Sequence, residues 1–442
     1  MTRTRPPLIR SSDARRDATP ARARYAFNRT RPLSLPLPCL AVSDFTASVR
    51  KLADLTVGFG ANVQPGQIVA VTTSPDKEEL TREIARAAYE HGARWVDVLT
   101  FDPWVKRQRI ALAPEDSLDF VPPWLMERLE WLSAEGAARI TLNGPTAPEA
   151  LDGLDPARAG HDLMPYLPNS GDVVNRRTTN WCVVPCPTVG WARAVYPELE
   201  PDAALERLWS VMIHICRLES DDPAGDWLKR FATLTATAAR LEARQFDAIH
   251  LHGPGTDLTV GLFRSSLWNA ADFVRVDGLK HYPNIPSEEM FTTPDPSRTD
   301  GYVSTTMPKE LYGSIIDGVR LEFAQGRVTK VEADRGADAL RAVIAKDEGA
   351  SRLGELALVD GEGRIGPLET VFLDTLIDEN AASHIALGNA YGFMVGDEAE
   401  RGRASQSAVH VDLMIGSAEL DIDGITEAGE HVPVLRNGHW QI

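Results

Sequence analysis

Hydrophobic and polar positions along the chain form two patterns, one typical of strands and one typical of helices, and segments of the two kinds alternate. Segments 67–74 (QIVAVTTS) and 94–101 (RWVDVLTF) are short apolar or β-branched runs, typical of buried strands. Between them, 77–93 (KEELTREIARAAYEHGA) has its apolar residues at helical spacing, as does a segment that begins near Ser43. A strand–helix–strand order predicts parallel strands joined by right-handed crossovers.

The same order continues to about residue 265, with further strands at 137–144, 180–187 and 247–253. We therefore expect an N-terminal open α/β domain over 43–265, with a largely parallel sheet. The glycines of GPGTDLTVGL (253–262) suggest a phosphate loop, but the string has neither a GK[ST] ending nor a GxGxxG pattern. A tight glycine turn between two strands is the prediction there.

The pattern changes after residue 280. Apolar and polar residues alternate on both sides of AQGR in 317–334, which predicts a hairpin; 337–350 predicts a helix, and 407–420 alternates like a strand. Strands and hairpins with interspersed helices predict an α+β domain over 266–442. Two domains also suit a chain of 442 residues, which exceeds what one hydrophobic core usually supports.

Charge and composition argue against two classes of protein, nucleic-acid-binding proteins and proteins with a membrane-spanning helix. A formal charge of −17 argues against a nucleic-acid-binding surface, and the sequence has no apolar run of the roughly 20 residues that a membrane helix needs. Nine arginines and several prolines fall within the first 40 residues, and we expect a disordered leader over 1–42 rather than a targeting peptide. The four cysteines are few and unevenly spread; Cys182 and Cys186 match no usual zinc spacing and are predicted to be buried thiols of a cytoplasmic protein.

Candidate chemistry lies in the last third of the chain, where oxygen and nitrogen ligands occur without a thiolate. Such a set suits one or two divalent metals and, with many carboxylates, hydrolysis. The candidates are Glu289, Glu355, His384, Tyr391, His410 and Asp412.

Spacing relates some of these residues to one another. His410 and Asp412 are two apart and would share one face of a strand. His384 and Tyr391 are seven apart, two turns on one side of a helix, although Gly388 is a helix breaker. Each has an ordinary alternative, because a glutamate is usually a surface charge, and a histidine or tyrosine among apolar neighbours is usually a hydrogen-bonded core residue.

Two further acidic residues extend the set. Glu379 lies where a helix could begin after Asp378, and from there it could reach a second metal. Glu288 and Glu289 are adjacent, so in an extended segment they point in opposite directions and only one is expected to be a ligand.

The strings NIPSEEM, LGELALV, DEN…HIALG…AY and HVDLMIG resemble the thermophilic-type metallo-aminopeptidases, the aminopeptidase T, aminopeptidase S and PepS family. The resemblance covers roughly 44–442, and the intervals of 66, 29, 7 and 2 residues within the candidate set match that family. The 19-residue interval from Tyr391 to His410 is a few residues shorter, which a shortened loop at ERGRASQS would explain. The family's metal ligands fall on all six candidates, and a further acidic position falls on Glu379.

The resemblance implies a dinuclear aminopeptidase that activates water between two divalent ions per subunit (zinc, cobalt, manganese or magnesium), with Glu355 as the bridge. It implies peptide substrates with a free N-terminus and a homodimer. Glu288 or Glu379 is the expected general base, and Tyr391 a late proton donor. Another metal-dependent amide hydrolase, or a metal-free binding or structural homodimer, remains the alternative.

Overall fold

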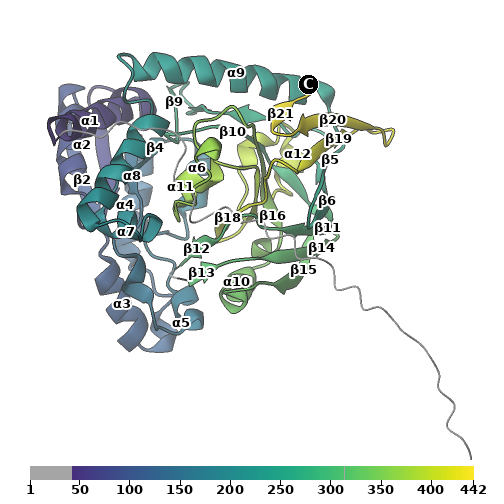
Figure 1. Cartoon of the computed structure of the whole chain (residues 1–442), viewed down its shortest axis with the longest axis horizontal. Coiled ribbons are helices and arrows are strands. Elements are labelled where there is room, and N and C mark those ends of the chain that lie inside the picture. Colours follow the sequence, from purple (N-terminus) through teal and green to yellow (C-terminus); the bar gives the residue numbers. More distant parts are fainter. Residues whose placement is uncertain (1–41, 313) are drawn as a thin grey trace, which may run out of the picture.

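A parallel sheet forms the first layer of the protein. The computed structural model describes residues 42–312 and 314–442, so the predicted leader lies almost wholly outside the described residues (Figure 1). The strand order is β2-β1-β3-β4, and every pair is parallel. These strands are β1 (Ile68–Thr73), β2 (Trp95–Thr100), β3 (Ala138–Asn143) and β4 (Asn180–Pro185).

Helices cover this sheet and connect its strands, as the sequence pattern predicts. The first continues into a π-helical turn over Thr56–Gly60. The helices of this half are α1 (Val42–Leu55), α2 (Glu78–Glu90), α3 (Pro103–Leu112), α4 (Pro123–Ala134), α5 (Pro156–His161), α6 (Ser170–Arg176), α7 (Val189–Val195), α8 (Pro201–Ile215) and α9 (Pro223–Arg244).

Two larger antiparallel sheets make up the rest of the fold. A five-stranded sheet has the order β18-β17-β16-β10-β7, formed by β18 (His410–Met414), β17 (His384–Gly388), β16 (Leu353–Val359), β10 (Glu289–Thr292) and β7 (Asn269–Ala270). An eight-stranded sheet has the order β15-β14-β11-β6-β5-β19-β20-β21, formed by β15 (Arg327–Glu332), β14 (Arg320–Ala324), β11 (Pro294–Ser304), β6 (Thr256–Leu262), β5 (Ala248–Gly253), β19 (Asp421–Ile425), β20 (His431–Arg436) and β21 (His439–Trp440).

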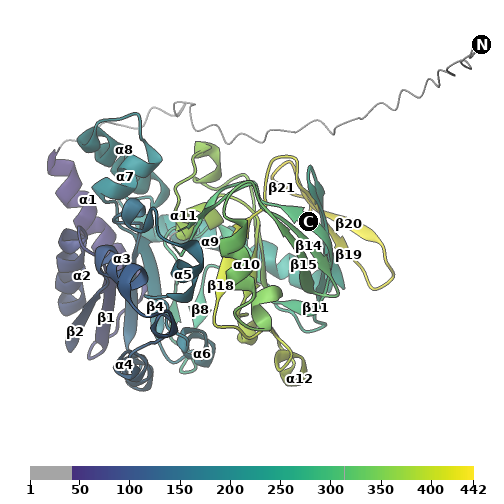
Figure 2. The ribbon, with the colours of Figure 1, turned by 90° about the horizontal axis from the view of Figure 1, so that it is seen from below.

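Smaller elements fill the gaps between these sheets. They are the strand pairs β8 (Phe273–Val274) with β9 (Lys280–His281) and β12 (Lys309–Leu311) with β13 (Ser314–Ile316), and the helices α10 (Ala337–Ile344), α11 (Thr375–Glu379) and α12 (Glu398–Arg401). Figure 2 shows the parallel sheet at one end of the molecule and strands β19 and β20 at the other.

Several predicted elements are confirmed. The AQGR hairpin is β14 paired with β15, the helix predicted from 337 is α10, and a glycine turn joins β5 to β6. Gly255 has a φ of +74°, which a glycine adopts without the steric cost of a Cβ. The mixed α/β class is confirmed as well.

Two predicted assignments are wrong. Strand β5 does not join the parallel sheet; it pairs antiparallel with β6 and β19, because an apolar run following a helix does not specify its partner strand. The predicted helix through His384 is the strand β17, whose five residues are all buried; such a strand lacks the alternation that separates strand from helix. The domain division near 265 stays a prediction, and the sheets favour placing it between β4 and β5.

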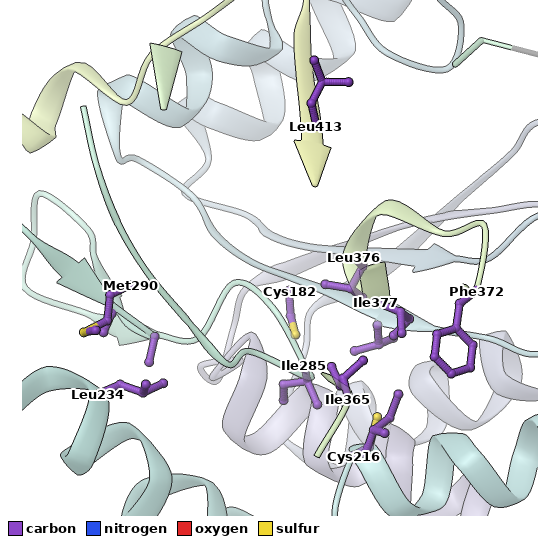
Figure 3. Packing of buried hydrophobic residues seen from close by; sticks show 14 of the residues in the cluster. Cys182, Cys216, Leu234, Ile285, Met290, Ile365, Phe372, Leu376, Ile377 and Leu413 are labelled. Atoms are coloured by element: carbon purple, nitrogen blue, oxygen red, sulfur yellow. The ribbon is translucent and has the colours of Figure 1, made fainter. Parts of the chain in front are cut away.

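One continuous hydrophobic core connects the two halves. Figure 3 shows Cys182 of β4 and Cys216, which follows α8, near Ile285 and Ile365 from the second half. Cys182 and Cys186 are buried free thiols, as predicted, and Cys216 is one as well. In the described part of the chain, no helix is long and apolar enough to cross a membrane.

Candidate metal centre

Four neighbouring strands of the five-stranded sheet present five of the six predicted ligands on one face, and Tyr391 lies after β17, outside the strands. Glu355 of β16 lies opposite Ala386 of β17, and Ala386 lies opposite Asp412 of β18, so these three side chains form one row across the sheet. Residues two apart in a strand share a face, which adds the ligands in the next rows. These are Glu289 at the start of β10, His384 on β17 and His410 on β18.

The ligand atoms form two groups that share Glu355. Nε2 of His384 lies 3.3 Å from Oε2 of Glu289 and 3.8 Å from Oε1 of Glu355. Nε2 of His410 lies 3.4 Å from Oε2 of Glu355 and 3.0 Å from Oδ1 of Asp412. Each of the two carboxylate oxygens of Glu355 therefore faces a different histidine.

The spacing and surroundings of these atoms fit divalent ions. Ligands about 2.1 Å from an ion in tetrahedral geometry are about 3.4 Å from one another, close to the separations measured here. Oε2 of Glu289 is buried, makes no hydrogen bond and has the His384 ring as its charged partner, an environment that suits a bound cation. The donor set, carboxylate and imidazole without thiolate, suits zinc, cobalt or manganese.

The charges of the cluster influence one another strongly. Burial raises the pKa of Glu289 to about 8, although His384 opposes that shift. Burial lowers the pKa of His384, but the carboxylates of Glu355 and Glu289 outweigh it and raise the value to about 10. Burial also raises the pKa of Asp412, yet His410 outweighs it and holds this carboxyl well below its usual range. A site with this excess of carboxylates favours cations.

Backbone carbonyls orient both histidines. Nδ1 of His384 lies 3.2 Å from the carbonyl of Ala382, and Nδ1 of His410 lies 2.8 Å from the carbonyl of Asn389. An Nδ1–H that donates to a carbonyl leaves Nε2 free to bind a metal, the arrangement usual for metal-bound histidine. Both contacts are made by backbone atoms, so the sequence offered no signal for them.

Glu379 and Tyr391 lie beside the two groups. Glu379 ends α11 rather than beginning a helix, and its Oε1 accepts a hydrogen bond of 3.4 Å from Asn284. Burial and the charge of Asp412 raise the pKa of Glu379 well above its ordinary value. The ring of Tyr391 lies 5.9 Å from that of His410. Burial, and to a smaller extent the negative charge of Glu355, raises the pKa of the Tyr391 hydroxyl.

Glu288 is placed differently from the other candidates. It is fully buried, and its two oxygens face Arg217 Nη2 at 3.0 Å and Arg230 Nε at 2.5 Å. Arg230 also pairs with Asp360 at 2.8 Å. The structure thus brings Glu289 into the ligand cluster and places the neighbouring Glu288 in a buried ion network, as expected for adjacent residues of an extended segment.

A cavity of about 990 Å³ connects the cluster to the parallel sheet. Tyr391 and His410 line it on the cluster side, and Thr72 and Thr141, of β1 and β3, line it on the side of the parallel sheet. Ligands in open α/β folds commonly bind beside the carboxyl ends of parallel strands. The cavity has the size of a small-molecule or short-peptide site.

Known proteins resemble this chain in sequence and, for one solved structure, in fold. The family model "Thermophilic metalloprotease (M29)" matches residues 45–440. Aminopeptidase T of Thermus aquaticus is 40% identical over 90% of this chain and 99% of its own, and Aminopeptidase AmpS of Bacillus subtilis is 35% identical over 90% and 100%. The solved structure of wild-type AmpT from Thermus thermophilus superposes with a TM-score of 0.81 at 39% identity, covering 90% of this chain and 100% of that one. The chain belongs to the thermophilic metalloprotease family M29.

Proposed function

We propose that this metallo-aminopeptidase binds two divalent ions, with Glu355 shared between them. The observation that carries the proposal is the position of Glu355, whose two oxygens face His384 and His410 at 3.8 and 3.4 Å. On this assignment one ion is held by Glu289, Glu355 and His384 and the other by Glu355, His410 and Asp412. When bound, such ions polarise a peptide carbonyl and lower the pKa of water enough for nucleophilic attack near neutral pH.

The side chains around the ligands divide the remaining tasks. Glu379 is our choice for the general base, because it lies beside the ligand cluster, accepts only a hydrogen bond of 3.4 Å from Asn284, and has its pKa raised by burial and by neighbouring carboxylates. Glu288 is a poor base, since both of its oxygens already accept from arginines. Tyr391 lies beside His410 and would serve as a late proton donor to the departing groups.

The aminopeptidases among the relatives support release from the N-terminus. A free α-amine would bind one of the ions or an acidic side chain of the ligand cluster, and either contact would select peptides with a free N-terminus. The cavity of about 990 Å³ accommodates a short peptide rather than a folded protein. We therefore propose short peptides with a free N-terminus as substrates.

A homodimer and a cytoplasmic location complete the proposal. Trp95 of the edge strand β2 is 59% exposed, and Trp124 and Trp131 of α4 are also exposed, an apolar surface that a second copy of the chain would cover. Three buried free thiols suit a reducing compartment.

Metal content decides the dinuclear assignment. After chelation and reconstitution, elemental analysis of the parent is compared with His384→Ala, His410→Ala and Glu355→Ala, with the exposed Glu362→Gln as the control. We expect each histidine variant to lose about one ion and Glu355→Ala to bind both ions more weakly, whereas the control should retain both ions. The two-ion assignment fails if Glu355→Ala affects only the ion lost in one histidine variant. Equal cleavage of N-blocked and free peptides would refute the aminopeptidase specificity.

A further inference from the structure

A second cluster of histidines and carboxylates lies on the eight-stranded sheet, remote from the candidate metal centre. His250 and His252 are two apart on β5 and share a face, while Ile249 and Leu251 point into the core. Asp423 of β19 lies directly opposite His250 in the antiparallel pair. Figure 1 shows β5, β19 and β20 on the side of the molecule away from β1 and β2.

The atoms of this cluster converge on one carboxylate oxygen. Nε2 of His252 lies 3.3 Å from Oδ2 of Asp423, and Nδ1 of His431, on β20, lies 3.6 Å from the same oxygen. The ring of His250 stacks on His252 with 5.1 Å between centroids and meets His431 edge-on at 5.3 Å. The two atom separations, 3.3 and 3.6 Å, are close to the roughly 3.4 Å between neighbouring ligands of a tetrahedral ion.

Neighbouring groups orient these ligands as they would around a metal. The guanidinium of Arg436 is bound to Oδ1 of Asp423, which leaves Oδ2 facing the histidines. Oδ1 of Asp257 lies 2.8 Å from Nε2 of His250, a contact that directs the other ring nitrogen, Nδ1, away from Asp257. This Nδ1 is buried and has no hydrogen-bond partner. A carboxylate that fixes the tautomer of a histidine is a common second contact at metal sites.

We propose that His250, His252 and Asp423, with His431 as a fourth ligand, bind a divalent transition ion of the zinc class. Imidazole nitrogens with a single carboxylate suit Zn²⁺, Cu²⁺ or Ni²⁺ and are poor ligands for Mg²⁺ or Ca²⁺. The ion joins β5 to the β19–β20 hairpin, so its role is to fix the C-terminal strands to the sheet. The site is independent of the ligands proposed for hydrolysis.

Zinc content and peptidase activity of the full chain test the site together. The parent, His250→Ala/His252→Ala and His439→Ala are stripped, reconstituted with Zn²⁺ and desalted; His439 is an exposed histidine on β21 and serves as the control. We expect the double variant to hold about one ion fewer than the parent and to remain an active peptidase, and the control to match the parent. If the double variant does not fold, His252→Gln replaces it.

Two results would overturn the site. The double variant could hold as much zinc as the parent, or the control could lose as much zinc as the double variant, which would indicate adsorption to surface histidines. The comparison depends only on the difference between variants, so it gives the same answer whether the hydrolytic centre binds one ion or two.

Discussion

Replacing Glu288 tests whether this residue, which lies beside the candidate metal centre, stabilises the fold or takes part in catalysis. This carboxylate has no exposed surface and neutralises Arg217 and Arg230, which are themselves 11% and 9% exposed. Glu288→Ala would leave both guanidinium groups in the interior with less compensation. Removing one partner of a buried ion pair costs about 3–5 kcal/mol.

The energetic cost of removing Glu288 should lie at the lower end of that range, because each arginine keeps a second contact. Arg230 keeps Asp360 at 2.8 Å, and Arg217 keeps its contact with the Trp227 ring at 4.5 Å. We therefore expect Glu288→Ala to lower the free energy of unfolding by about 3 kcal/mol. Unfolding entropy of roughly 2.1 cal/mol/K per residue over roughly 400 residues converts this into a fall of about 4 °C in the midpoint of thermal unfolding.

The assay pairs thermal unfolding with kcat measured well below the midpoint. Glu288→Ala should lower the midpoint while kcat per folded molecule falls less than about tenfold, and Glu379→Gln should do the opposite, with kcat reduced by about 10² or more. The exposed Glu362→Gln is the control for both measurements. If Glu288→Gln abolished kcat and left the midpoint unchanged, Glu288 would be the base and our assignment would be refuted.

Three other outcomes are expected. Burial lowers the pKa of His281 to about 3, so stability is lost as the pH falls from about 6.5, where an unfolded histidine takes up a proton, toward 3. In urea unfolding, the free energy of unfolding should fall by about 2–3 kcal/mol more in the parent than in His281→Phe when the pH changes from 7 to 4.5. Gly388 has a φ of +107°, and a Cβ there would lie 2.1 Å from the carbonyl oxygen of Val409. Gly388→Ala should therefore lower the midpoint of thermal unfolding, and, because Gly388 pairs with His410, it should also lower the metal content found by elemental analysis. In a Cys39→Ser background, a thiol reagent should modify the native protein slowly even at pH 9 and rapidly after unfolding, because burial raises the pKa of Cys182, Cys186 and Cys216.

Local patterns in the sequence predicted those parts of the site that local geometry determines. His410 and Asp412 do share a strand face, because alternation within one strand is a property of the strand itself. His384 was assigned to a helix, since a short run that is buried throughout fits either period. The resemblance to the thermophilic-type metallo-aminopeptidases predicts the ligand set as a whole, including residues on separate strands that no local pattern connects.

Long-range pairings were beyond prediction from the sequence. Glu288 meets Arg217 and Arg230 across 71 and 58 residues of sequence, and no periodicity marks such a pair. Strand β5 has the same apolar pattern whether its partner is parallel or antiparallel, so its sheet could not be assigned. Both cases depend on how segments meet in the folded chain, which propensity does not determine.

The placement of the proposed ligands on four neighbouring strands has a consequence for biosynthesis. Because side chains alternate between faces, a shift of one residue in the pairing of β17 with β18 would turn His410 and Asp412 away from Glu355. The binding pocket for the ions therefore exists only in the correctly paired sheet, and β18 is the last of its strands to leave the ribosome. A nascent chain that lacks β18 would hold no complete centre, so we expect no peptidase activity before β18 has been synthesised and paired.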